Sequence, residues 1–199
     1  MKQDRKNSSA PVPPQTARPG HLVLVAGPSG AGKDSIIAAA AARLRTDGRF
    51  VFPARVVTRA SSVAEAHDSM SREAFAAARE DGAFAFVWGA HGLDYGIPTS
   101  IEADFAAGRT VVCNVSRTVV GTARERFGRA MYIEITAPAE VLRSRLVARG
   151  RETVAEIDAR LARQAVAPGG ALPDVVIGNG GSLDDAVERF LAAIGAGVA

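Results

Sequence analysis

A glycine-rich loop constrains this chain more than any other feature of its sequence. It lies between the apolar run at 22–26 and the alanine-rich stretch at 35–40. Its residues are Gly27, Pro28, Ser29, Gly30, Ala31, Gly32, Lys33 and Asp34. A strand before such a loop and a helix after it are the context that phosphate binding requires. Glycines let backbone N–H groups approach an anion, and the helix N-terminus adds partial positive charge. The sequence therefore predicts a nucleotide-binding loop in which Lys33 reaches the β- and γ-phosphates.

The residue after Lys33 departs from the general pattern of such loops. A Ser or Thr is usual there, and its hydroxyl binds Mg²⁺. Here the position holds Asp34, and Ser35 follows. A carboxylate is also a hard oxygen ligand, so Asp34 can bind the metal directly or through water. An acidic residue at this place also simply favours the helix dipole. Both interpretations stay open, with Asp34 and Ser35 as the candidate metal ligands.

The length of 199 residues suits one domain with a sizeable core. Residues 1–19 are polar and proline-rich, which predicts a disordered tail, and we expect 20–199 to form a single domain. No apolar run approaches the roughly 20 residues needed to span a bilayer. Cys113 is the only cysteine, so no internal disulfide can form. We therefore expect a cytoplasmic protein without a membrane partner.

The net charge of +3 comes from the first 19 residues. The other 180 residues contain 20 basic and 20 acidic side chains and are neutral. This is not the charge pattern of a general nucleic-acid binder, so we expect no nucleic-acid partner. Any anion site must come from local clustering of arginines.

Apolar segments and turn residues predict alternating strands and helices. The predicted strands lie at 22–26, 50–57, 83–88, 110–115, 129–135 and 174–177. The predicted helices lie at 32–45, 72–80, 100–107, 116–127, 136–149, 153–165 and 183–194. The stretches at 60–70 and 89–96 are predicted to be loops. The alternation predicts a parallel sheet with helices on both faces, and a ligand site at the carboxyl edge of that sheet.

Arginines cluster in the last third of the chain, at positions 143, 145, 149, 151, 160 and 163. Arg145 and Arg149 are four residues apart and share one helix face. Arg149 and Arg151 flank Gly150 at a predicted helix end, where a lid could close over phosphates. Arginine suits this role because its planar fork binds phosphate oxygens bidentately. The alternative is a set of solvated helix faces paired with nearby carboxylates, and we favour the phosphate-binding lid for the cluster as a whole.

Several motifs accompany the glycine loop. Thr58-Arg59 follows the second predicted strand, and Tyr95-Gly96 follows the central segment. With Arg145 and Arg149, they resemble the guanylate kinase-like branch of the P-loop kinases over about residues 21–195. The resemblance implies an α/β fold with a core parallel β-sheet flanked by helices. It also implies a small acceptor-binding region at about 57–97 and an Arg-bearing lid at about 149–155.

The departures from guanylate kinases are informative. Those enzymes read the guanine edge with a Glu, which falls on Phe86 when counted back from Tyr95 without a gap. A later Asp of theirs falls on Asn114, and a second Arg falls on Ser62. A guanine site needs buried acceptors for N1–H and the amino group, and Phe86 supplies none. This mismatch is expected to cost several kcal/mol of guanine recognition.

Other motifs resemble a different family more closely. They are the Asp34-Ser35 pair after the lysine, Asn114-x-Ser116-Arg117, and Arg149-Gly150-Arg151-Glu152. They are similar to the ribose 1,5-bisphosphate phosphokinase family. That family transfers the γ-phosphoryl group of ATP to ribose 1,5-bisphosphate, which gives 5-phosphoribosyl 1-diphosphate, and it is linked to phosphonate breakdown. The resemblance implies ATP and Mg²⁺ as cofactors and the sugar bisphosphate as substrate.

The resemblance also implies roles for single residues. The loop residues and Ser35 are assigned to binding the ATP phosphates. The residues assigned to stabilising the charge of the transition state are Lys33, Arg145, Arg149 and Arg151. The acceptor is assigned to Arg59, Tyr95, Asn114, Ser116, Arg117 and Arg160. Arg59, Tyr95 and Arg117 are candidates for binding the acceptor's phosphates. Asn114 or Ser116 is a candidate for binding its ribose hydroxyls. Asn179 is a candidate for the adenine pocket by its position.

Two other functions compete with this interpretation. One is a nucleoside monophosphate kinase, including a divergent guanylate kinase, which the missing guanine acceptors argue against. The other is a non-catalytic guanylate kinase-like binding module, which the intact glycine loop with Lys33 argues against. The oligomeric state is left open, with a homodimer as one option.

Overall fold

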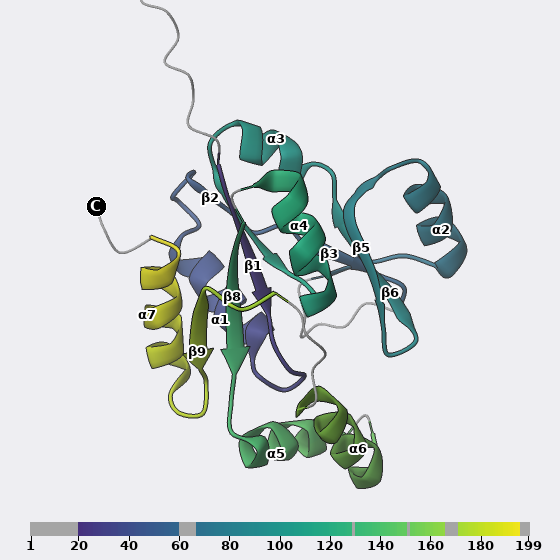
Figure 1. Cartoon of the computed structure of the whole chain (residues 1–199), viewed down its shortest axis with the longest axis vertical. Helices are drawn as coiled ribbons and strands as arrows, with labels where there is room; N and C mark the ends of the chain where they lie inside the picture. The colour runs from purple at the N-terminus through teal and green to yellow at the C-terminus, as the bar shows by residue number, and fades with distance from the viewer. Residues whose placement is uncertain (1–19, 60–66, 129, 151, 166–170, 196–199) are drawn as a thin grey trace, which may run out of the picture.

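The computed structural model describes residues 20–59, 67–128, 130–150, 152–165 and 171–195. Its centre is a five-stranded parallel sheet in the order β2-β7-β1-β8-β9 (Figure 1). The strands are β1 (His21–Ala26), β2 (Phe50–Val51), β7 (Thr110–Asn114), β8 (Ala130–Thr136) and β9 (Val175–Gly178). The predicted fold class, a parallel sheet flanked by helices, is confirmed. The predicted tail at 1–19 lies outside the described residues.

Helices cover both faces of this sheet, so β1 is buried on both sides. Leu22 and Leu24 point into one core with α3 (Ile101–Ala106) and α4 (Val120–Phe127). Val23 and Val25 point into the other, with α1 (Lys33–Arg43) and α7 (Leu183–Ala193). A strand buried on both faces reads as a continuous apolar run, which is why the run at 22–26 predicted it.

A second sheet of four strands lies beside the first, in the order β4-β3-β6-β5. The strands are β3 (Arg55–Val57), β4 (His67–Ser69), β5 (Phe84–Ala90) and β6 (Leu93–Pro98). Helix α2 (Arg72–Glu80) packs against β5 and begins at Ser71, whose Oγ accepts a hydrogen bond from Ala74 N. This sheet occupies most of the predicted acceptor-binding region.

Three of the predicted elements in the region of the second sheet are wrong. The single strand predicted at 50–57 is two strands in different sheets, separated by a segment with Pro53, which has no N–H for a ladder. The loop predicted at 60–70 contains β4; its residues 60–66 lie outside the described chain. The loop predicted at 89–96 is a hairpin instead. Its turn is formed by His91 (φ 53°) and Gly92 (φ 71°), both left-handed as a tight hairpin requires.

The last third of the chain forms a pair of helices and then adds β9 at the edge of the central sheet. Helices α5 (Ala139–Arg149) and α6 (Val154–Ala165) are joined at Gly150 and pack together. A capping box begins α6, because Thr153 N donates to Glu156 Oε2 at 2.8 Å and Glu156 N donates to Thr153 Oγ1 at 3.3 Å. The turn at Gly150 therefore separates two stable helices.

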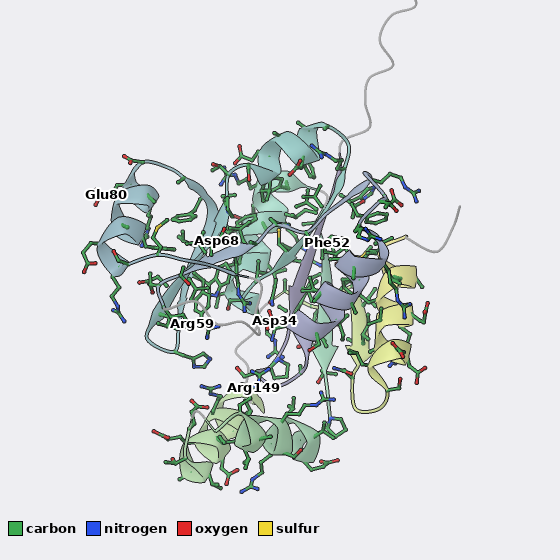
Figure 2. The ribbon with its side chains drawn as sticks, turned by 180° about the vertical axis from the view of Figure 1, so that it is seen from behind. Asp34, Phe52, Arg59, Asp68, Glu80 and Arg149 are labelled. Carbon is green, nitrogen blue, oxygen red and sulfur yellow. The ribbon has the colours of Figure 1, made fainter. Side chains whose placement is uncertain are left out.

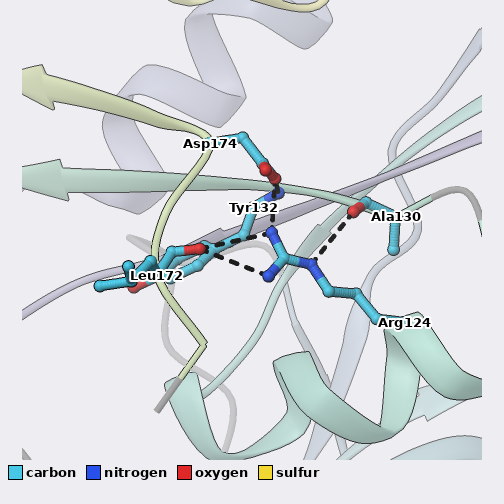
Figure 3. Close-up of polar contacts among 5 residues, drawn as sticks. All are labelled: Arg124, Ala130, Tyr132, Leu172 and Asp174. Atoms are coloured by element: carbon cyan, nitrogen blue, oxygen red, sulfur yellow. Dashed lines mark hydrogen bonds and ion pairs between the residues drawn. The ribbon is translucent and has the colours of Figure 1, made fainter. Parts of the chain in front are cut away.

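An arginine fixes the approach to β9. Arg124 on α4 forms an ion pair of 2.6 Å with Asp174, and its guanidinium also donates to the carbonyls of Leu172 and Ala130 (Figure 3). Asp174 Oδ2 accepts a further bond from Tyr132 N at 2.7 Å. These contacts hold the residues before β9 against β8, with which β9 then pairs. None of the helices in the described part of the chain has the length and apolarity needed to cross a bilayer.

Candidate active site

The glycine loop connects the carboxyl end of β1 to the first residue of α1. Gly27 has φ of 144°, and a Cβ there would lie 2.0 Å from the Ile135 carbonyl oxygen. Gly32 has φ of 86°, and a Cβ there would lie 2.3 Å from Asn179 Nδ2. Both positions therefore require glycine on two counts, backbone conformation and close packing. The loop has the shape that brings backbone N–H groups and the α1 N-terminus to one place.

Lys33 is the first residue of α1 and folds back over the loop. Its Nζ donates to the carbonyl oxygens of Gly27 at 2.9 Å and Pro28 at 3.0 Å. The pKa of Lys33 is lowered from 10.5 to about 8, mainly because burial disfavours the charged amine. Asp34 opposes this shift, and the guanidinium groups of Arg55, Arg117 and Arg149 add to it. An anionic phosphate beside the amine would favour its charged form.

A cavity of about 440 Å³ opens beside the loop. Fourteen of the residues chosen from the sequence line it, and they come from both sheets and the helical pair. They are Gly27, Pro28, Ser29, Gly30, Gly32, Lys33, Asp34, Arg59, Tyr95, Asn114, Ser116, Arg117, Arg149 and Arg160. Asp34, Arg59 and Arg149 mark three sides of it in Figure 2.

Three of the residues assigned to the loop and the lid do not line the cavity. Ala31 is a buried residue of the loop, and Ser35 is exposed on α1. Arg145 lies behind the loop and donates from Nη1 to the Gly30 carbonyl at 3.4 Å. Arg151 lies outside the described residues. Arg145 therefore contacts the loop backbone, whereas Arg149 lines the cavity itself.

The charge of the cavity wall is strongly positive. Among the described lining residues, the cations are Lys33, Arg55, Arg59, Arg117, Arg149 and Arg160. The carboxylates among them are Asp34 and Glu152. Glu152 accepts a hydrogen bond from Arg160, and Arg117 is paired with Glu134. These ion pairs hold two arginines in fixed positions, and the cationic excess suits reactants that carry several phosphates.

Asp34 is held by two side chains. Its Oδ1 accepts a hydrogen bond from Asn114 Nδ2 at 2.8 Å and forms an ion pair with Arg55 Nη2 at 3.1 Å. Within the described chain, no partner is recorded for its Oδ2. A carboxylate oxygen of this kind beside the glycine loop fits Mg²⁺ that is bound mainly by substrate phosphates and water. The described residues contain no group of three or more His, Cys, Asp or Glu side chains that could hold a metal ion. The exposure of Ser35 favours Asp34 of the two candidates.

The wall of the second sheet contains residues that sequence reasoning did not assign. The rings of Trp88 and Tyr95 stack with centroids 5.4 Å apart, and the Arg55 guanidinium lies 5.8 Å from the Tyr95 ring centroid. His91 also lines the cavity from the hairpin turn. The one feature of the sequence that could have indicated a functional role for Arg55 is its charge beside the apolar residues of β3. Trp88 gave no signal, because it continues an apolar run that reads as core.

Phe86 is not part of the cavity wall. It is 4% exposed and packs against Phe127 in the core. The alignment that placed a guanine-reading Glu on Phe86 therefore falls on a core position.

Asn179 lies behind the loop rather than in the cavity wall. It is 3% exposed, and its Nδ2 donates to the Ala31 carbonyl at 2.8 Å. Its Oδ1 is buried and has no hydrogen-bond partner among the described residues. The contact between Asn179 and Ala31 fixes the loop to the end of β9. Its candidacy for the adenine pocket stays a prediction.

Curated relatives cover nearly the whole chain. Ribose 1,5-bisphosphate phosphokinase PhnN from Methylobacterium radiotolerans is 48% identical over 174 residues, which are 87% of this chain and 97% of the relative. The protein of the same name from Acidiphilium cryptum is 49% identical over 174 residues, which are 87% of this chain and 92% of the relative. The chain belongs to the ribose 1,5-bisphosphate phosphokinase family. The family resemblance seen in the motifs is thereby confirmed.

A solved structure agrees on the fold. Guanylate kinase from Anaplasma phagocytophilum matches with a TM-score of 0.64 and 19% identity, over 89% of this chain and 86% of that chain. This phosphokinase therefore has the guanylate kinase-like P-loop kinase fold. No protein-family model matches the chain.

Proposed function

We propose that this kinase transfers the γ-phosphoryl group of ATP to ribose 1,5-bisphosphate, giving 5-phosphoribosyl 1-diphosphate and ADP. The observation that carries the proposal is the cavity beside the glycine loop, whose cations outnumber its carboxylates and whose two carboxylates are already paired. The family relatives support it by name.

The chemistry needs positive charge more than a general base. An oxygen of the 1-phosphate attacks the γ-phosphorus, and the bond from that phosphorus to the bridging oxygen of ADP breaks. The attacking oxygen needs no deprotonation, because the second pKa of a phosphate monoester is about 6. The barrier comes from bringing two anions together, and fixed cations lower it. The wall of arginines fits that requirement.

The residues divide by their proposed roles. The loop and Lys33 would bind the ATP phosphates, and Mg²⁺ held at Asp34 would neutralise charge on them. Arg59, Tyr95 and Arg117 would bind the acceptor phosphates, with Asn114 and Ser116 at its hydroxyls and Arg160 as a further acceptor residue. Arg149, beside Gly150 at the end of α5, would approach the transferred group from the lid. Arg151 keeps its proposed lid role.

The deciding experiment measures ADP release from ATP and Mg²⁺ with ribose 1,5-bisphosphate and GMP as parallel acceptors. We expect turnover with the sugar bisphosphate alone, and formation of 5-phosphoribosyl 1-diphosphate by phosphorus NMR. Turnover with GMP alone would overturn the proposal in favour of guanylate kinase. Binding of ATP without turnover of either acceptor would favour a non-catalytic module. A cytoplasmic location, a part in phosphonate breakdown and a homodimer stay predictions.

A further inference from the structure

Arg55 contacts both halves of the cavity, and nothing in the motif assignments gives it a role. It begins β3 of the second sheet, and its side chain is only 12% exposed. Its Nη2 lies 3.1 Å from Asp34 Oδ1 on α1, and its guanidinium lies over the ring of Tyr95 on β6. One side chain therefore joins the candidate metal ligand to the candidate acceptor residue.

The contact with Asp34 sets up a competition. In the ligand-free protein, the Asp34 carboxylate partly neutralises the Arg55 guanidinium. An acceptor phosphate near Tyr95 would have to compete with Asp34 for that guanidinium. A divalent cation at Asp34 would compete with Arg55 for the carboxylate. The cation and the acceptor phosphate therefore both break the ion pair between Asp34 and Arg55, the cation by binding the carboxylate and the phosphate by binding the guanidinium.

We propose that Arg55 couples the two subsites: a magnesium nucleotide at Asp34 releases the Arg55 guanidinium, which then binds a phosphate of the acceptor. The inference deepens the proposed function and rests on it. Two ligands that bias one ion pair in the same direction help each other to bind, and the effect is reciprocal. Asn114, which donates to the same Asp34 oxygen, would keep the carboxylate oriented when Arg55 leaves it.

The test measures the Kd of ribose 1,5-bisphosphate by isothermal titration calorimetry, alone, with ADP and Mg²⁺, and with ADP and EDTA. ADP cannot transfer a γ-phosphoryl group, so no turnover interferes. In the unmodified protein, we expect ADP with Mg²⁺ to tighten acceptor binding by about 5- to 150-fold, the usual range of coupling between sites. We expect no such gain with ADP and EDTA.

Variants of the ion pair give the sharper result. Asp34→Asn and Asp34→Ser remove the Asp34 carboxylate from Arg55, so the acceptor should bind more tightly without nucleotide than it does in the unmodified protein, and ADP with Mg²⁺ should add little. Ser is the ordinary residue of such loops at this position, so one of these variants matches a natural loop. Arg55→Gln should bind the acceptor weakly under all three conditions, and the double variant Arg55→Gln with Asp34→Asn should behave like Arg55→Gln.

The double variant separates the proposal from general electrostatics. If Asp34→Asn tightens acceptor binding equally in the Arg55→Gln background, the gain comes from the lost negative charge alone, and the coupling role is overturned. Retained coupling in Arg55→Gln would overturn it as well. The ion pair of Arg49 and Asp47 offers matched controls. Arg49→Gln and Asp47→Asn should leave the Kd of ribose 1,5-bisphosphate unchanged under all three conditions. Failure of the proposed function would look different, because the unmodified protein would then not turn over ribose 1,5-bisphosphate.

Discussion

The two walls of the cavity are built from different parts of the chain. On the side of the five-stranded sheet, the part of the wall beside β1 is backbone: a glycine loop that two glycines and Lys33 fix in one shape. On the side of the four-stranded sheet, the wall is made of side chains such as Arg55 and Tyr95, which are held by one another. We expect the glycine loop to bind any nucleotide phosphate. We expect the side chains of the second sheet, together with those that follow β7, to decide which acceptor is used.

The largest expected effect is on the backbone wall. Lys33→Met should lower kcat by about 10²–10³, because a single preorganised charge on a reacting phosphoryl group is worth that much. Steady-state kinetics with ATP and ribose 1,5-bisphosphate would measure it. Arg43→Met, on the exposed end of the same helix, is the control and should retain activity. A kcat within threefold of the unmodified protein would remove Lys33 from the reacting centre.

The next effect belongs to the side-chain wall. Arg59→Ala should raise the acceptor KM by about 10- to 100-fold, because a hydrogen bond to a charged group contributes about 1.5–3 kcal/mol. The KM of ATP should not change. Arg49→Ala provides an exposed arginine as the control. An unchanged acceptor KM in Arg59→Ala would show that the acceptor lies elsewhere.

A smaller effect tests the shape of the loop itself. Gly32→Ala forces a side chain into a left-handed position against Asn179, which should cost about 1–3 kcal/mol. We expect a lower melting temperature and a raised KM for ATP. Gly48→Ala is the matched control, because a Cβ there meets no atom within 4 Å. Equal melting temperatures for the two variants would contradict the tight fit described for Gly32.

The smallest effect is a pH dependence. Because the pKa of Lys33 is lowered to about 8, the amine loses charge as the pH rises through 8, whereas bound phosphate favours the charged form. ATP affinity should therefore be about twofold weaker at pH 8 than at pH 7 and should fall further above pH 8. Calorimetry in two buffers at pH 8 should also detect proton uptake on binding. Lys33→Met should lack this step, and a persistent step would assign it to another group.

The same division explains what could be predicted from the sequence. The glycine loop and the helices that begin after Ser71, Thr153 and Ser182 depend on local patterns, and the structure has them close to where they were predicted. The hairpin at β5 and β6 was missed because Asp94-Tyr95-Gly96 has no apolar alternation. The other edge of β6 pairs with β3, which lies much earlier in the sequence. The ion pair of Arg55 with Asp34 joins residues far apart in sequence, so no spacing rule indicates it.

Trp88 has a practical consequence. It is the single tryptophan of the chain, and it lines the cavity while its ring stacks on Tyr95. Indole emission from this protein therefore originates at one point, on the wall assigned to the acceptor. The folded chain carries its own optical probe, so that site occupancy can be followed in real time without a label.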